Sequence, residues 1–387
     1  MTDKIQVAKP IVGDREVDAV EEVIRSGHYV SGPNVEQFEN RFADYIGTEE
    51  AVGLNTGTAA LHLALAICGI GPGDEVIVPP LTFFSTVTSV LHQNAVPVFA
   101  DIDPDSYCLD PDSVEQQITP RTKAVIPVHL YGQSADMDAF VELADSHDLV
   151  LIEDCAQAHG TRYRGQTVGS IGDFGAFSFY ATKHMTTGEG GALTTNNPEW
   201  AEKARQLRSH GMTDRDHHDY LGYNYRINEI AAAMGLEQLN RLEELNEQRI
   251  ENSLYLIEQL EQLDRDWFET PTLYDHIRHT FFWCHLQIDE QELGMDTNEL
   301  RLILEERGVE TRHRYQEPLY KQKILTKKSA YPEKFPFDSE YYPEPIDYDD
   351  VHFPHVENIA GTMIGLPNRP DLEQDQLDRI VEVMAQI

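Results

Sequence analysis

The sequence is poor in lysine and cysteine and contains no long apolar run. Its 387 residues include 67 acidic but only 30 basic ones, a net charge of −37, and arginines outnumber lysines two to one. A surface this negative repels the phosphates of nucleic acids and anionic lipids, so neither is expected as a partner. Acidic excess with scarce lysine suits solubility in concentrated salt and indicates a halophilic source, with an acidic protein of ordinary cytoplasm as the alternative.

Other absences restrict location and metal chemistry. Without an apolar run of about 18 residues, no membrane-spanning helix is expected. Residues 1–6, Met-Thr-Asp-Lys-Ile-Gln, lack the pattern of a secretory signal, so we expect a cytoplasmic protein. The four cysteines show no Cys-x-x-Cys spacing, which argues against disulfides or a zinc cluster. The histidine-rich residues 210–218 lack ligand spacing, so we expect a solvated loop there and no metal site.

Short apolar runs alternate with amphipathic segments from residue 50 onward. Such runs, separated by helices, are typical of strands buried on both faces of a mostly parallel sheet, and therefore of an α/β fold. The predicted strands are residues 51–54, 75–78, 96–100, 124–128, 149–152, 174–179 and 191–195, and the clearest predicted helices are 57–67 and 84–93.

The pattern changes after residue 224. Residues 227–263 carry apolar positions at helical spacing and predict one long helix. We expect a large domain over residues 1–250 and a smaller C-terminal α+β domain over residues 251–387. Within the latter, the sequence predicts a strand at 281–288, a helix at 297–307 and a loop at 331–345.

The first segment with unusual chemistry is Leu-Ile-Glu-Asp-Cys-Ala-Gln at residues 151–157. It places Asp154 directly after an apolar strand, where parallel sheets gather functional groups. A carboxylate there suits the pyridine nitrogen of pyridoxal phosphate (PLP), which must stay protonated to accept electrons. A cap on the following turn or helix is the alternative role for Asp154.

The second segment, residues 177–191, places Lys183 beyond a strand and ahead of a glycine-rich turn. A lysine in such a place can project into a cleft, where burial depresses its pKa and makes it nucleophilic. Ser178 offers a hydroxyl to a phosphate. An ordinary surface lysine beside a tight turn is the alternative.

The third segment, Asn-Thr-Gly-Thr-Ala-Ala-Leu at residues 55–61, precedes a predicted helix. Free N–H groups and the positive end of the helix dipole form a site for a phosphate ester. The segment is neither a Walker loop nor a G-x-G-x-x-G, so ATP and NAD are not indicated. Thr58 as an ordinary N-cap is a compatible alternative.

Together and in this order, the segments resemble the DegT/DnrJ/EryC1/StrS family of PLP-dependent nucleotide-sugar aminotransferases. The resemblance covers nearly the whole chain and rests mainly on Glu-Asp-Cys-Ala-Gln-Ala at 153–158 and Lys-x-x-Thr-Thr-Gly-Glu-Gly-Gly at 183–191. It also includes residues 27–33, 80–83 and 222–226. It implies the aspartate aminotransferase fold (fold type I), with a large, mostly parallel sheet and a smaller C-terminal domain.

The resemblance also implies roles for single residues. Lys183 would bind PLP as a Schiff base and shuttle the proton. The implied cofactor-binding residues are Asp154 at the pyridine nitrogen, Gln157 near the ring hydroxyl, Phe83 stacked on the ring, and Ser178, Gly57 and Thr58 at the phosphate.

A homodimer is implied as well, with each site completed by the neighbouring subunit. Asn224 of that subunit would reach the phosphate, and its Arg226 would bind a substrate carboxylate or phosphate. A surface ion pair is the alternative for Arg226. Tyr315 matches a position that faces the sugar, with core or interface packing as its alternative.

The implied activity moves an amino group from glutamate to a nucleotide-linked keto sugar, in amino-sugar and surface-polysaccharide biosynthesis. His184 and the Thr-Thr-Gly-Glu-Gly-Gly run favour amination at carbon 4. A PLP-dependent sugar dehydratase is one alternative, but such relatives carry histidine in place of the lysine that is present here as Lys183. A non-catalytic PLP-binding regulator is another; the negative charge argues against DNA binding, and Lys183 and Asp154 are both present.

Overall fold

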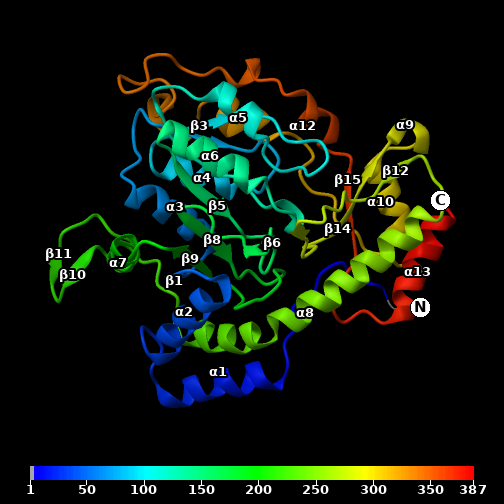
Figure 1. Ribbon diagram of the computed structural model, residues 1–387, viewed down its shortest axis with the longest axis horizontal. Helices are drawn as coiled ribbons and strands as arrows, with labels where there is room; N and C mark the ends of the chain where they lie inside the picture. The colour runs from blue at the N-terminus through cyan, green and yellow to red at the C-terminus, as the bar shows by residue number, and fades with distance from the viewer. Residues whose placement is uncertain (1–3) are drawn as a thin grey trace.

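The computed structural model describes residues 4–387; the first three residues of the segment inspected for a signal lie outside it. The described chain contains a seven-stranded sheet with strand order β1-β9-β8-β5-β4-β2-β3 (Figure 1). All pairs are parallel except those of β9, which runs antiparallel to both neighbours. The predicted α/β fold is therefore confirmed. The strands are β1 (Glu50–Leu54), β2 (Glu75–Val78), β3 (Val96–Phe99), β4 (Thr122–Val125), β5 (Val150–Asp154), β8 (Phe174–Ser178) and β9 (Gly191–Thr195).

The apolar runs form these strands because both faces of the sheet are covered. Every residue of β2, β3 and β9 is buried. The run predicted at 124–128 is regular only as far as Val125, since Pro127 has no N–H to donate to a ladder; Val128 then pairs with Asp154 as an isolated bridge. The helices between strands are α3 (Gly57–Ile67), α4 (Ser85–His92), α5 (Pro111–Gln117), α6 (Met137–His147) and α7 (Pro198–Leu207).

Three further helices pack together below the sheet in Figure 1: α1 (Asp14–Ser26), α2 (Pro33–Ile46) and the long α8 (Glu229–Glu261). Asn228 caps α8 by accepting a hydrogen bond from the Ala231 N–H. The buried Glu229 carboxylate accepts three backbone N–H bonds from residues 32–35 at the start of α2. The beginning of α8 is thus fastened to the beginning of α2.

A second hydrophobic core lies at the far end of α8, where Leu256 and Leu260 are fully buried. It contains a three-stranded antiparallel sheet, and α8 therefore contributes to both cores. The predicted C-terminal strand and helix are present, the strand beginning at residue 284 instead of 281. The elements here are β12 (Phe268–Glu269), β14 (Cys284–Ile288), β15 (Met363–Leu366), α10 (Thr297–Glu306) and α13 (Gln374–Ala385).

The segment between α10 and β15, which both belong to the second core, packs in the first core. Tyr320, Phe337 and Tyr348 are buried in the first core, and the Tyr342 hydroxyl donates to Glu75 at the start of β2. The predicted loop at 331–345 therefore covers the large sheet (Figure 1, orange). The division at residue 250 stays a prediction.

The remaining elements are short. Residues 210–218, expected as a solvated loop, form an exposed hairpin of β10 (Met212–Asp214) and β11 (His217–His218) that projects from the body (Figure 1). No helix within residues 4–387 has the length and apolar character needed to cross a membrane. The other short elements of the fold are β6 (Arg162–Tyr163), β7 (Gln166–Thr167), β13 (Ile277–Arg278), α9 (Glu290–Leu293), α11 (Lys323–Thr326), α12 (Pro354–Ile359) and the 3-10 turns η1 (Leu130–Gly132), η2 (Leu319–Lys321), η3 (Pro332–Lys334) and η4 (Tyr348–Asp350).

Candidate active site

Asp154 and Lys183 lie at or just beyond the carboxyl-terminal ends of two neighbouring strands of the large sheet. Asp154 ends β5, which pairs in parallel with β8 and places Asp154 opposite Ala176. The chain leaves both strands on the same side, and Lys183 lies in the turn after β8, its N–H donating to the Tyr180 carbonyl at 2.9 Å. The charges of Asp154 and Lys183 act on each other. The two residues that the sequence singles out therefore share one site.

Lys183 has the environment of a nucleophilic lysine. Burial lowers the pKa of its ammonium to about 8, although the charge of Asp154 opposes this shift. Its Nζ lies 4.6 Å from the ring centroid of Phe282, a contact that sequence reasoning did not find. Near neutral pH, part of the Lys183 population is uncharged and can attack a carbonyl or accept a proton.

Asp154 is held in one orientation inside the protein. Its Oδ2 accepts a hydrogen bond from the Thr86 hydroxyl at 2.9 Å, and its Oδ1 accepts one from the Ala156 N–H at 3.1 Å. Burial raises the pKa of this carboxyl despite both bonds. Within residues 4–387, no arginine or lysine lies within ion-pair distance of it. A buried carboxylate of this kind needs a cationic partner, and the protonated pyridine nitrogen of PLP supplies one.

A cradle for an anion lies where α3 meets the end of β8. Thr56 caps α3 by accepting the Ala59 N–H at 3.0 Å, so Thr58 is not the N-cap considered above. A Cβ on Gly57 would lie 2.8 Å from the Ser178 Cβ, which means that only glycine allows this approach. The Ser178 side chain thus lies against the first turn of α3, whose free N–H groups suit a phosphate.

Gln157 links the sheet edge to a substrate-sized cleft. Its Oε1 accepts the Tyr131 N–H at 3.1 Å, and its Nε2 donates to the Tyr315 hydroxyl at 3.1 Å. Burial raises the pKa of Tyr315 to about 12, so its hydroxyl stays protonated. Tyr315, Phe83 and Arg314 line a cleft of about 570 Å³, and 64% of Phe83 is exposed to it or to solvent. A ring could therefore stack on Phe83 without rearrangement of the core.

Asn224 and Arg226 lie beside the start of the third segment. Asn224 is exposed, and its backbone carbonyl accepts a hydrogen bond from Asn55 Nδ2 at 3.3 Å. Arg226 donates to the Ser209 hydroxyl at 3.1 Å, and in the described part of the chain it has no carboxylate partner. The surface ion pair considered for Arg226 is thus absent from the described residues. That Asn224 and Arg226 complete the active site of a neighbouring subunit stays a prediction.

One buried cluster near the site has metal-ligand chemistry but a structural role. His129, Glu153 and Cys155 place potential ligand atoms within 4.8 Å of one another. However, the Glu153 carboxylate already accepts three backbone N–H bonds from residues 169–172, each 2.8 Å long, and contacts His129 Nε2 at 3.0 Å. Glu153 thereby fixes the loop between β5 and β8 that separates Asp154 from Lys183.

The comparison with known proteins agrees with this geometry. The DegT/DnrJ/EryC1/StrS aminotransferase family profile matches residues 10–346. This chain belongs to that family. The spore coat polysaccharide biosynthesis protein SpsC of Bacillus subtilis is 38% identical to it over 98% of this chain and 95% of its own length. The described fold also matches two solved relatives across nearly the whole chain.

One is DesV of Streptomyces venezuelae in complex with a ketimine intermediate: 36% identity, 96% and 93% of the two chains covered, TM-score 0.86. The other is a sugar aminotransferase of Streptococcus pneumoniae in its PLP form: 27% identity, 99% and 98% covered, TM-score 0.86. The latter is also known in the PMP form. The family member described here is accordingly a PLP-dependent sugar aminotransferase of nucleotide-sugar biosynthesis. The fold type, the enzyme class and the cofactor expected from the sequence are all confirmed.

Proposed function

We propose that this aminotransferase takes the amino group of glutamate and transfers it to carbon 4 of a keto sugar carried by UDP, dTDP or GDP. The observation that carries the proposal is a buried lysine of lowered pKa that feels the charge of the buried Asp154, which in turn acts on Tyr315 in the cleft that Phe83 also lines. The electrostatic action of Asp154 on Tyr315 connects the cleft to the reacting centre.

The protein's own residues have separate tasks in this reaction. PLP, when bound, supplies an electron sink for the carbon that loses its proton. Lys183 attaches the cofactor and moves that proton, since its lowered pKa suits both acceptance and return. Asp154, oriented by Thr86, keeps the ring nitrogen protonated. Ser178 and the first turn of α3 hold the phosphate, and Phe83 supports the ring.

The first experiment is an absorption spectrum of the holoenzyme before and after glutamate is added. Conversion of the visible band of lysine-bound PLP to the near-ultraviolet band of the amino form supports the donor half-reaction, and Lys183→Ala must lack the visible band. A coloured enzyme that glutamate leaves unchanged would contradict glutamate as donor and favour another donor or dehydratase-like chemistry.

The acceptor is tested on the amino form of the enzyme. We expect 4-keto sugars linked to a nucleoside diphosphate to restore the visible band, with the new C–N bond located by NMR of the product. Relatives named for 3-amino sugars linked to dTDP and UDP make a 3-keto sugar the direct competitor. Faster recovery with the 3-keto sugar would refute the assignment to carbon 4 and leave the donor half-reaction standing.

We further propose a homodimer in which Asn224 and Arg226 complete the site of the other subunit. Asn224 is exposed, and Arg226 is free of carboxylate partners in the described part of the chain. Subunit mixing tests this: Lys183→Ala and Asn224→Ala, each weakly active alone, should restore activity in mixed dimers. Mixed dimers no more active than the two parents would contradict a shared site.

The setting of the reaction is also proposed. We expect a cytoplasmic enzyme of surface-polysaccharide synthesis that works in high salt, because the net charge of −37 gives strong surface repulsion until salt screens it. The measurement is the temperature of unfolding in low and in molar salt. A protein equally stable in both would argue against a halophilic source.

A further inference from the structure

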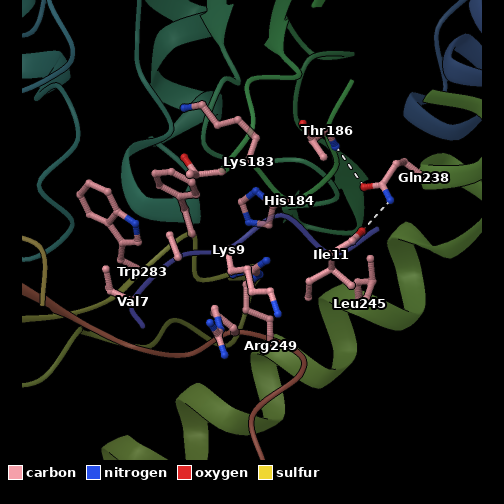
Figure 2. Close-up of a pocket in the computed structure, with 14 residues that line it drawn as sticks. Val7, Lys9, Ile11, Lys183, His184, Thr186, Gln238, Leu245, Arg249 and Trp283 are labelled. Carbon is pink, nitrogen blue, oxygen red and sulfur yellow. Dashed lines mark hydrogen bonds between the residues drawn. The ribbon is translucent and has the colours of Figure 1, made fainter. Parts of the chain in front are cut away.

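A second, much smaller cavity lies on the other side of the segment that carries Lys183. It has a volume of about 20 Å³ and is lined by residues 7–9 and 11, residues 182–184 and 186, three residues of α8, residues 282–283 and Arg369 (Figure 2). In Figure 2 the ammonium of Lys183 extends away from Lys9 and Arg249, which line the opposite side. Lys183 contributes to the wall of this cavity, but none of the residues that line it also lines the cleft of Phe83 and Tyr315.

All the lysine, arginine, aspartate and glutamate side chains that line this cavity in the described chain are basic. Lys9, Arg249 and Arg369 contribute to it, and no aspartate or glutamate does so in the described chain. Arg249 and Arg369 are each only 8% exposed. Two of the basic side chains that line the cavity are thus almost completely removed from bulk water, whereas Lys9 is exposed.

Arg249 lacks a partner that would offset this burial. Its Nε has no hydrogen-bond partner, and its side chain forms no ion pair with any residue from 4 to 387. The carboxylate that acts on it, Asp371, already lies 3.0 Å from the Arg369 Nε and is partly exposed. Burial and the neighbouring charge of Arg369 lower the pKa of Arg249 to about 10. An uncompensated buried charge is costly, so this arrangement favours a bound anion.

The size of the cavity restricts the anion. A volume of about 20 Å³ leaves room for only a small ligand among these side chains, which favours a monatomic anion over a phosphate or carboxylate group. We propose that this cavity binds one monatomic anion, chloride in physiological media, between Arg249, Arg369 and Lys9. The anion joins the N-terminal segment and Arg369 to α8, directly behind the backbone of Lys183.

Chloride binding is measured by the ³⁵Cl NMR line width in the presence of the holoenzyme, in which PLP occupies the phosphate site. We expect wild-type protein to broaden the line and bromide to compete, and Arg249→Met to lose most of the excess broadening. Arg164→Met is the matched control, because Arg164 is an exposed arginine paired with Asp138. Equal broadening by wild-type protein and Arg249→Met would overturn the proposal.

A second measurement does not depend on the folding of a variant. Crystals of the wild-type holoenzyme soaked in bromide should give an anomalous peak between Arg249 and Arg369. A water molecule at that position, with bromide only on the surface, would overturn the proposal even if Arg249→Met fails to fold. Wild-type protein should also unfold at a temperature a few degrees higher in chloride than in gluconate at equal ionic strength, as expected for a ligand bound only by the folded state.

Discussion

The close approach of α3 to β8 predicts a large effect of a single methyl group. In Gly57→Ala the new Cβ would lie 2.8 Å from the Ser178 Cβ and 3.1 Å from the Phe177 carbonyl oxygen. Neither neighbour is the end of a flexible side chain, so α3 must move away from Ser178. Overpacking of this kind costs about 1–3 kcal/mol, and if that cost falls on the phosphate cradle, PLP affinity drops roughly 5- to 150-fold.

The assay is titration of the apoprotein with PLP, followed by the visible absorption of the bound cofactor. Gly71→Ala is the matched control, because the nearest atom to its new Cβ would be the Gln93 carbonyl oxygen at 3.9 Å. Wild-type protein and Gly71→Ala should bind PLP equally. If Gly57→Ala also binds it equally, the first turn of α3 does not hold the phosphate and the reasoning fails.

Three other substitutions test the remaining parts of the site. Asp154→Asn should keep PLP bound but slow the glutamate half-reaction at least about 100-fold, measured by stopped-flow absorption. In the apoprotein, the pKa of Lys183 falls from its ordinary value of 10.5 in the unfolded chain to about 8 in the folded protein. Between these two pH values the unfolded chain binds the proton more fully, so the free energy of unfolding of the wild-type protein should rise with pH relative to that of Lys183→Met, as measured in thermal melts. Glu153→Gln should lower the free energy of unfolding by about 3 kcal/mol or more in urea titrations, because the amide cannot accept all the N–H bonds that the carboxylate accepts.

The strands and the reacting pair could be predicted because their signals are local. An apolar run followed at once by Asp154, or by a polar turn containing Lys183, reveals a strand end without any knowledge of its neighbours. The contact between Asp154 and Thr86 could not be read in this way. It depends on the tertiary packing that brings the start of α4 to the end of β5, although Thr86 lies only three residues beyond the Pro-Leu-Thr-Phe motif.

Contacts between segments that are distant in the chain were harder to predict from the sequence. Prolines and tyrosines at 331–345 break any periodicity, so the sequence predicts a loop, whereas burial of Phe337 and the bond from Tyr342 to Glu75 attach this segment to the large sheet. Likewise, nothing in the sequence relates Lys9 to Arg249 and Arg369, because these residues meet only once both cores are assembled around α8.

The length of α8 acts as a fixed spacer between the two cores. Its Leu242 is buried in the first core and its Leu256 in the second. Each added residue turns a helix by roughly 100° and lengthens it by about 1.5 Å. One residue inserted between these leucines would therefore rotate Leu256 and Leu260 out of the second core, while Glu229 stays fastened to α2. An insertion of seven residues would nearly restore the rotation, but it would separate the cores by about 10 Å. Both the length of α8 and the rotation between its two ends are thus fixed, because each end must bury its apolar residues in a different core.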